Sequence, residues 1–332
     1  MHEIVNKTPF SAEGVILQDK NGEKQWIVAV KATYNILDDG TTEIAEEQKP
    51  VTTAPVYLDE PGTSSLLYDT DFVLSKKTTD VILNGSAHAP KGKTKSSLKV
   101  KLKVANINKT LLVKGTRRWI GFLFIVFKGL MKPFSKMPIT YENTYGGTDP
   151  DNEKRLHKKN PVGTGYLTWP WKLKGQNVPN IYSGSFVSRL LGNKSVGFGP
   201  VASNWHPRLK FGGTYDEKWE KTKKPLLADD FKDEFFQCAP KDQQTKSFLT
   251  GGEPVELTNL SPEGKLSFEI PKISLNLKTV FDDKDDEISP LLHTVIIEPD
   301  DKTVSTVWHI SVPCQNRDEI LRKTEIRLSD SL

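Results

Sequence analysis

The segment from Leu98 to Val104 reads LKVKLKV, and its strict alternation of aliphatic and charged residues decides the fold class. Successive side chains of a β-strand point to opposite faces, so this pattern predicts a strand with one buried and one solvated face. The lysine face could be a basic binding stripe. Lysines on an exposed strand more often guard a sheet against edge-to-edge pairing, so we predict a solvated face.

Strand patterns recur on the N-terminal side of this segment. Alternating apolar residues from Trp26 to Tyr34 predict a strand with one buried face. Asn21-Gly22 suits a type I′ turn that would join this strand to another at Val15–Gln18. A further apolar segment follows from Asp80 to Ala89.

The C-terminal third repeats the pattern, with strands predicted at Leu266–Ile270, Ile273–Val280, Leu291–Glu298 and Val304–Val312. The last two would form a hairpin across Pro299–Lys302. One face of its second strand would carry Val304, Thr306, Trp308, Ile310 and Val312. Only Arg317–Lys323 has the pattern of a helix, and it is short.

The central region differs from both ends, because residues 137–253 are dense in Gly, Pro, Trp, Tyr and Asp. Such a composition favours ordered loops with small aromatic anchors. We therefore predict a mainly β protein, with antiparallel sheets packed as a sandwich or partial barrel, a long loop-rich central region and little helix. A single domain would span 1–332, with an N-terminal β part at 1–115, a loop-rich motif region at 116–255 and a C-terminal β part at 256–332.

The most apolar run is Ile120–Phe127, IGFLFIVF. Eight residues are less than half of the roughly 20 that a membrane-spanning helix needs, so we predict no stable membrane insertion. The run is interpreted as a buried strand or a core plug under a loop. A loop that contacts a membrane or a partner is the alternative.

Composition limits the function classes. Net charge is +4, from 46 basic and 42 acidic residues, which is too balanced to indicate nucleic-acid binding. The two cysteines, Cys238 and Cys314, lie far apart, outside any CxxC motif, and fit a reducing compartment. The N-terminus has no secretory signal pattern. These observations predict a soluble cytoplasmic protein.

Catalytic and metal motifs are absent from the sequence. The six histidines form no HxxxH pair, and there is no GxSxG elbow or Walker loop, so we predict no catalytic residue, metal or cofactor. One alternative remains open. Asp229-Asp230 and Glu253 could act as a glycosidase pair, with Trp205 and Trp219 stacking on a sugar.

Several ordered motifs carry a resemblance to a known family. They are GSAHAP at 85–90, VKGTRRW at 113–119, MPITYENTYGGTD at 137–149, NPVGTG at 160–165, VPNI at 178–181, GFGPVASNWHPR at 197–208, GTYDEKW at 213–219, DDFKDEFFQCAPKDQ at 229–243, LTGGEPVEL at 249–257 and TVIIEPDDKTVSTVWH at 294–309. In these the chain resembles the DUF2169 family, whose members are regarded as adaptors or chaperones for effectors of bacterial type VI secretion systems.

The resemblance implies a non-enzymatic adaptor. It would bind a secreted effector protein in the cytoplasm and help load it onto the spike formed by VgrG and PAAR proteins. The loop region is rich in the residue types found at interface hot spots, which favours a contact surface there. The predicted partner-binding residues are Trp205, Arg208, Tyr215, Asp216, Trp219, Phe231, Phe235, Gln243 and Glu253.

The adaptor function has two alternatives, and the predicted contact surface has one. The protein could be a carbohydrate-binding or carbohydrate-active β-protein, or a structural component of the secretion spike. The motif residues could also be framework. In that case Arg208 would pair with Asp216 or Glu253, and Trp205 with Pro207 would pin a loop.

Overall fold

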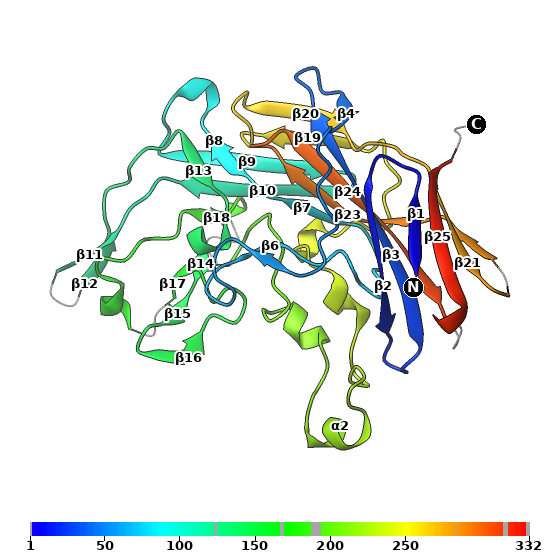
Figure 1. Ribbon diagram of the computed structural model, residues 1–332. Coiled ribbons are helices and arrows are strands. Elements are labelled where there is room, and N and C mark those ends of the chain that lie inside the picture. The colour runs from blue at the N-terminus through cyan, green and yellow to red at the C-terminus, as the bar shows by residue number, and fades with distance from the viewer. Residues whose placement is uncertain are drawn as a thin grey trace.

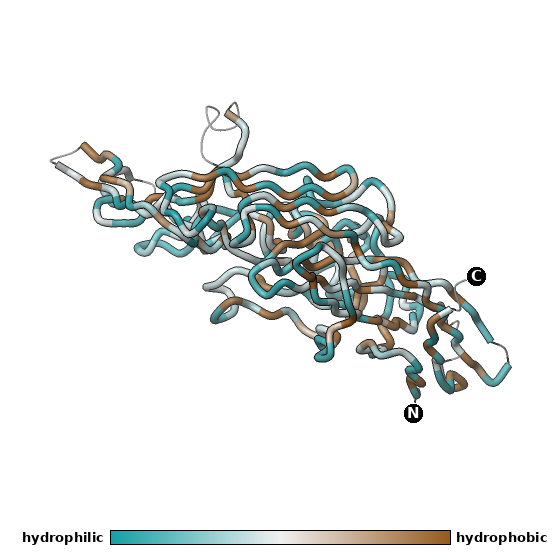
Figure 2. Tube along the Cα trace, turned by 90° about the horizontal axis from the view of Figure 1, so that it is seen from above, coloured by the Kyte–Doolittle hydropathy of each residue, from teal (hydrophilic) through white to brown (hydrophobic). Residues whose placement is uncertain are grey.

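Two β-sheets packed face to face form the centre of the structure (Figure 1). The structure is a computed structural model that describes residues 2–122, 125–166, 169–186, 194–283, 285–314 and 318–329. The sheets are mainly antiparallel, with parallel pairing of residues 80–83 with 294–297 and of 3–6 with 323–326, and they confirm the mainly β class predicted from the sequence. Figure 2 shows that the molecule is elongated.

The main sheet joins the two ends of the chain. Its strand order is β2 (Ser11–Gln18), β3 (Lys24–Ile36), β24 (Thr303–Pro313), β23 (Leu291–Glu298) and β7 (Asp80–Leu83), with β4 (Thr42–Ile44) paired to the end of β3. The predicted hairpin of β23 and β24 is confirmed, and so is that of β2 and β3. N-terminal and C-terminal parts therefore share one sheet.

The second sheet has the order β18 (Ile181–Ser183), β10 (Ile107–Lys114), β9 (Ser97–Val104), β19 (Pro254–Thr258) and β20 (Lys265–Glu269). In β9, Val100, Leu102 and Val104 are buried while the lysines face outward, which confirms the alternation in LKVKLKV. Lys103 forms an ion pair with Glu256 at 2.9 Å. The lysine face is thus a solvated face that pairs with the neighbouring strand.

A third sheet closes one end of the molecule, with the order β1 (Glu3–Asn6), β25 (Leu321–Leu328), β21 (Leu275–Phe281) and β22 (Asp285–Ile288). Its inner residues join the same apolar core as the two larger sheets. Arg317–Lys323 is not a helix: Arg317 lies outside the described residues, Asp318–Ile320 is one 3-10 turn, and β25 begins at Leu321. Alternating β-strand periodicity in 321–328 and pairing with β21 override the short helical pattern.

Between these sheets the chain forms short strands and turns. The strands are β5 (Val56–Tyr57), β6 (Leu66–Tyr68), β8 (Ser86–His88), β11 (Trp119–Phe122), β12 (Ile125–Lys128), β13 (Lys136–Pro138), β14 (Tyr145–Gly146), β15 (Thr148–Asp149), β16 (Asn152–Leu156) and β17 (Thr164–Gly165). The 3-10 turns are at Pro90–Gly92, Tyr141–Asn143, Pro170–Leu173 (η3), Arg208–Phe211, Asp233–Phe236 and Lys241–Gln243. Among the described residues, the α-helix is α2 (Glu217–Thr222). None of the described helices is long and apolar enough to cross a bilayer.

Two details of the β2–β3 hairpin differ from the prediction. Of Asn21 and Gly22, only Gly22 has a positive φ, whereas a type I′ turn needs both. The turn is instead held by Asp19, whose carboxylate accepts the backbone N–H groups of Asn21 and Glu23. Strand β3 is also buried on both faces rather than one. Residues 48–71 cover part of the second face, where Gln48 bonds to Thr33 and Asp71 pairs with Lys31, and the sequence pattern gave no sign of this.

The face of the main sheet that points away from the apolar core, here called the outer face, is covered by a polar layer. Three buried ion pairs lie in this layer: Lys31–Asp71 at 3.0 Å, Lys76–Asp80 at 2.8 Å and Arg208–Asp69 at 2.8 Å. Each joins a loop residue to the sheet or to another loop. Charges so far from water persist only when they are paired and hydrogen-bonded, so this layer fixes the loops in one arrangement.

The Gln243 side chain connects three chain segments, which contain Val81, Phe198 and Lys109. It is fully buried and donates hydrogen bonds to the carbonyl oxygens of Val81 at 2.7 Å and Phe198 at 2.8 Å. Its Oε1 accepts from the Lys109 ammonium at 2.8 Å. Burial lowers the pKa of Lys109, while the adjacent Asp242 opposes that change.

We expect Gln243→Ala to lower the free energy of unfolding by about 3 kcal/mol, because two carbonyl groups and the Lys109 ammonium lose buried partners. Gln244→Ala is the matched control, because Gln244 is only partly buried and bonds to Ala239. Gln244→Ala should lower the free energy of unfolding by less than about 1 kcal/mol. Urea unfolding monitored by tryptophan fluorescence measures both. Equal losses in the two variants would contradict the bridging role.

Two buried histidines on neighbouring strands of the main sheet, His293 on β23 and His309 on β24, stack on each other. The rings of His293 and His309 have centroids 4.2 Å apart, and Phe248 stacks on the other side of His293. Burial is the main cause that lowers both pKa values, that of His309 to about 4. A hydrogen bond to the backbone of Val73 opposes the change at His309, and the positive charge of Lys76 adds to it.

The histidine stack makes stability depend on pH. An unfolded histidine binds a proton below about pH 6.5, whereas His309 in the folded state does so only near pH 4. Stability therefore falls as the pH drops between these values. Between pH 7.5 and 5 we expect His309 alone to remove about 2 kcal/mol. Urea unfolding at both pH values should show a smaller loss for His309→Gln than for the wild-type protein, and identical losses would refute the assignment.

Candidate protein-binding groove

Four of the nine residues predicted to bind a partner are buried: Trp205, Arg208, Phe231 and Gln243. Trp205 packs edge-on against Tyr141, with ring centroids 5.5 Å apart. The Arg208 guanidinium pairs with Asp69 and donates to the carbonyl oxygens of Val201 and Phe235. The alternative pairing of Arg208 with Asp216 or Glu253 is therefore wrong, and the structure gives these four side chains framework contacts.

The other predicted residues lie in three places. Tyr215, Asp216 and Trp219 meet at α2, where Tyr215 is half exposed and packs against Trp219 at 4.8 Å. Asp216 caps the helix by accepting the Trp219 backbone N–H. The Arg208 guanidinium lies over the Phe235 ring, with its Cζ atom 5.4 Å from the ring centroid. Glu253 accepts two backbone N–H groups of the turn before β19. The nine residues thus form no single surface.

The carboxylates considered for sugar hydrolysis each have a local partner. Asp229 pairs with Lys223 at 2.8 Å, and Asp230 accepts two hydrogen bonds from Thr214. These partners hold the pKa of both carboxyls below the usual range, whereas a glycosidase acid needs a raised one. Among the described residues, no group of His, Cys, Asp or Glu is placed to hold a metal ion.

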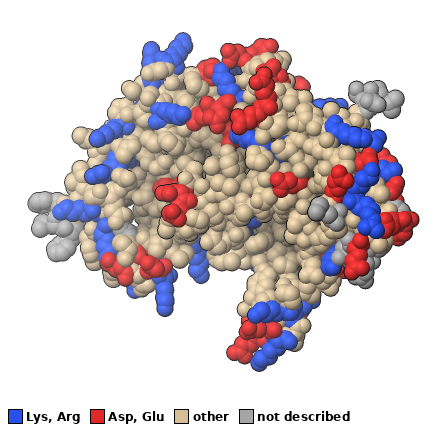
Figure 3. Space-filling model, viewed as in Figure 1, with Lys and Arg blue, Asp and Glu red and all other residues tan. Residues whose placement is uncertain are grey.

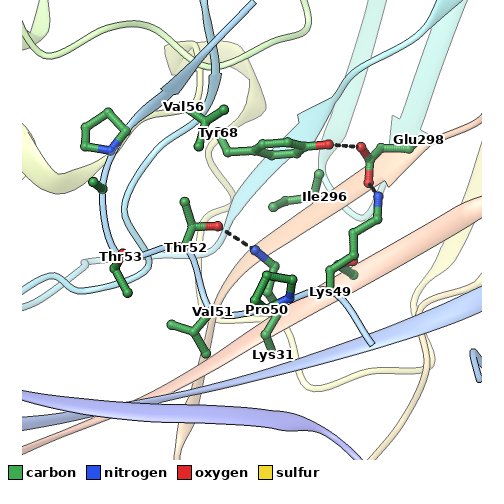
Figure 4. A pocket seen from close by; sticks show the side chains of 13 residues that line it. Lys31, Lys49, Pro50, Val51, Thr52, Thr53, Val56, Tyr68, Ile296 and Glu298 are labelled. Atoms are coloured by element: carbon green, nitrogen blue, oxygen red, sulfur yellow. Dashed lines mark hydrogen bonds and ion pairs between the residues drawn. The ribbon is translucent and has the colours of Figure 1, made fainter. Parts of the chain in front are cut away.

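A cavity of about 460 Å³ opens on the outer face of the main sheet (Figure 4). It lies along residues 45–56, an extended segment that we call the strap. The strap supplies Pro50, Val51, Ala54, Pro55 and Val56 to the wall, and Ile296 of β23 adds to the floor. Val56 is 43% exposed. The wall is therefore apolar and partly open to solvent.

The polar groups of this cavity satisfy one another. Figure 4 shows the Tyr68 hydroxyl and the Lys49 ammonium meeting at the Glu298 carboxylate from two sides. Lys31 donates to the Thr52 hydroxyl at 2.8 Å. Burial raises the pKa of Tyr68, and so do the hydrogen bond to Glu298 and its negative charge. Tyr68 therefore stays protonated, and the ion pair leaves the cavity floor without net charge.

A second cavity of about 610 Å³ continues along the strap and shares Lys49 and Pro50 with the first. Its rim carries Glu43, Glu46 and Glu47, which are all exposed and have no ion-pair partner in the described part of the chain. Figure 3 shows acidic side chains gathered over β4 and β20. We call the two adjacent cavities the strap groove. One half is apolar and the other is acidic.

Side-chain hydrogen bonds hold the strap against the sheet. The Gln48 side chain donates to the Thr33 carbonyl oxygen at 2.9 Å and accepts the Thr33 N–H at 2.8 Å, so it replaces a neighbouring strand. The Thr52 N–H donates to Asp71 at 2.7 Å, and Asp71 also pairs with Lys31. The position of the strap thus depends on the buried Asp71 carboxylate.

Sequence reasoning missed the strap groove, although two signals were present. The segment PVTTAPV at 50–56 has prolines at positions 50 and 55, which favour extended backbone. The run DDGTTEIAEE at 38–47 places five carboxylates in ten residues. Neither signal indicates which sheet face the strap crosses. That depends on contacts with Tyr68, Asp71 and Glu298, and Glu298 lies 249 residues beyond Lys49 in the sequence.

The fold places this chain in the class of β-sandwich proteins, with an open groove on the outer face of the main sheet. The chain belongs to the DUF2169 family, described as "Uncharacterized protein conserved in bacteria", whose model matches residues 21–309. No curated protein and no solved structure matches the chain.

Asp71→Ala should lower the free energy of unfolding by about 3 kcal/mol, because the buried Lys31 ammonium loses its charged partner. It should also speed hydrogen exchange in the strap, since the Thr52 N–H loses its acceptor. Asp59→Ala is the control, because Asp59 is exposed and only its backbone N–H forms a hydrogen bond, to Ser64. Unfolding and hydrogen exchange read by mass spectrometry test both. Unchanged exchange of the strap in Asp71→Ala would contradict the anchoring role.

Proposed function

We propose that this protein is a non-enzymatic adaptor that binds a type VI secretion effector in the bacterial cytoplasm and helps load it onto the VgrG and PAAR spike. In this proposal the strap groove holds an extended segment of the effector. The family resemblance supplies the secretion context, and the strap groove supplies a place for a protein partner.

The observation that carries the proposal is the division of the strap groove into an apolar and an acidic half. A segment with an apolar side chain near Val56 and a basic side chain near Glu46 and Glu47 would complement both halves. Apolar burial contributes affinity, while the carboxylates select register and attract basic segments. The neutral, internally bonded floor offers no unpaired charge that such a segment would have to neutralise.

Affinity capture from the host that expresses the secretion cluster tests the adaptor role. The tagged protein should recover one toxin-like protein together with VgrG or PAAR components, identified by mass spectrometry. Glu46→Lys/Glu47→Lys should weaken recovery about tenfold, because two attractive charges in the strap groove become repulsive. The matched control Glu13→Lys/Glu23→Lys changes the same charge on β2 and the β2–β3 turn and should leave recovery unchanged.

The location of the protein during secretion separates an adaptor from a spike component. An adaptor should remain in the cells while its effector appears in the medium. Immunoblots of both fractions measure this distribution. Release of the protein with the effector would favour a structural role in the spike. Recovery of no effector and no spike protein would overturn the proposal.

A further inference from the structure

The hairpin of β11 and β12 projects from one end of the long axis (Figures 1 and 2). It contains most of the apolar run at 120–127, whose predicted burial is wrong. Ile120 is 46% exposed, Ile125 69% and Phe127 49%. Residues 123 and 124 lie outside the described part of the chain. The local cause is that the two halves of the run pair with each other rather than with a larger sheet.

The exposed apolar side chains share one face of the hairpin. Ile120 lies directly opposite Phe127 in the antiparallel register, and Ile125 is two residues from Phe127. Side chains opposite each other or two apart on a strand point to the same side. Leu130, just beyond β12, is 94% exposed. Contiguous apolar surface of this kind on a soluble protein marks an interaction site.

The opposite face of the hairpin is aromatic and basic. The Lys128 ammonium lies over the Trp119 ring at 5.4 Å, and an Arg117 guanidinium nitrogen is 3.4 Å from the Tyr182 hydroxyl. The Nε of Arg117 is buried without a hydrogen-bond partner in the described part of the chain. Desolvation lowers the pKa of Lys128, and the positive charges of Arg117 and Lys114 lower it further. Cations therefore gather here.

Arg117, Arg118 and Lys128 lie in a segment without acidic residues. Residues 113–137 contain six basic residues and no Asp or Glu, and of these six Lys136 pairs with Asp300 at 3.1 Å. Neither Arg117, Arg118 nor Lys128 has an ion-pair partner among the residues that the structure describes. Nearby, Trp169 and Trp171 stack at 5.0 Å and are both about half exposed. The surface is complementary to a partner that brings both carboxylates and apolar side chains.

The backbone of the hairpin is open on one side. β11 pairs with β12 and also bonds to residues 175–177, whereas β12 packs beside η3 but, among the described residues, forms strand pairing with β11 alone. An edge strand with unpaired N–H and C=O groups is a template for a further strand. An extended polypeptide satisfies these groups in a regular ladder, which a lipid surface does not.

We propose that the β11–β12 hairpin binds an extended acidic segment of a partner protein as a third strand along β12. Alternate apolar side chains of the segment pack on Ile125 and Phe127, and its carboxylates reach Lys128 and Arg117. This surface is separate from the strap groove and does not depend on the adaptor role. An adaptor with two surfaces of opposite charge would hold two different segments.

Peptide display on the intact protein tests this assignment without knowledge of the partner. Twelve-residue random peptides are selected on the wild-type chain and counter-selected on Ile125→Ser/Phe127→Ser. Enriched peptides should alternate apolar residues with Asp or Glu. Fluorescence anisotropy with one enriched peptide should show at least about tenfold weaker binding for the variant, and binding that weakens with added salt. Leu291→Ser/Leu328→Ser, at two other half-exposed leucines, should bind as the wild type does.

The strand geometry has its own test. N-methylation of the peptide at the residues whose N–H groups face β12 should abolish binding, whereas methylation at the intervening residues should leave it intact. Enrichment of basic peptides, equal binding by Ile125→Ser/Phe127→Ser, or insensitivity to methylation would each overturn the proposal. So would hairpin-dependent binding to phosphatidylcholine–phosphatidylglycerol vesicles with no peptide enriched. These results are independent of whether affinity capture recovers an effector.

Discussion

Paired buried charges hold residues 69–76 between the main sheet and the loop-rich region, and the rest of the structure depends on them. Lys31–Asp71 and Lys76–Asp80 join this segment to the sheet, and Arg208–Asp69 joins it to the loop-rich region. The sandwich core is apolar, but the outer face of the sheet carries Lys31 and other polar groups under the loops. Replacing such a pair with apolar residues can be neutral, while removing one partner is strongly destabilising. The layer therefore selects one arrangement of the loops more than it adds stability. The shape of the strap groove depends on that arrangement of the loops.

The two candidate surfaces arise from different physical causes. The strap groove exists because Gln48 and Asp71 hold an extended segment above the sheet without filling the space beneath it. The hairpin surface exists because a short apolar run pairs with itself and reaches beyond the body of the molecule. One surface is a recess with carboxylates on its rim, and the other is a protrusion with cations around it. Their chemistry selects different partner segments.

The sequence predicted the elements whose residues alternate or flank a clear turn. LKVKLKV, the β23–β24 hairpin and the mainly β class all follow from local periodicity. The candidate site could not be predicted in the same way. Trp205 and Gln243 belong to motif-rich loops and look like interface residues, yet they are buried because partners distant in the chain enclose them. For Ile120–Phe127 the error was opposite: hydropathy predicts burial only when another element is available to cover the segment.

The pairing of β3 with β24 also affects how the protein is made. Residues 25–35 meet 303–313 in one continuous register, so β3 gains its second long neighbour in the main sheet only when the last part of the chain has been synthesised. At the usual speed of translation, that interval is on the order of tens of seconds. During this time an apolar strand has no permanent neighbour on one side. The protein thus passes through a stage of its own synthesis in which one side of an apolar strand is uncovered.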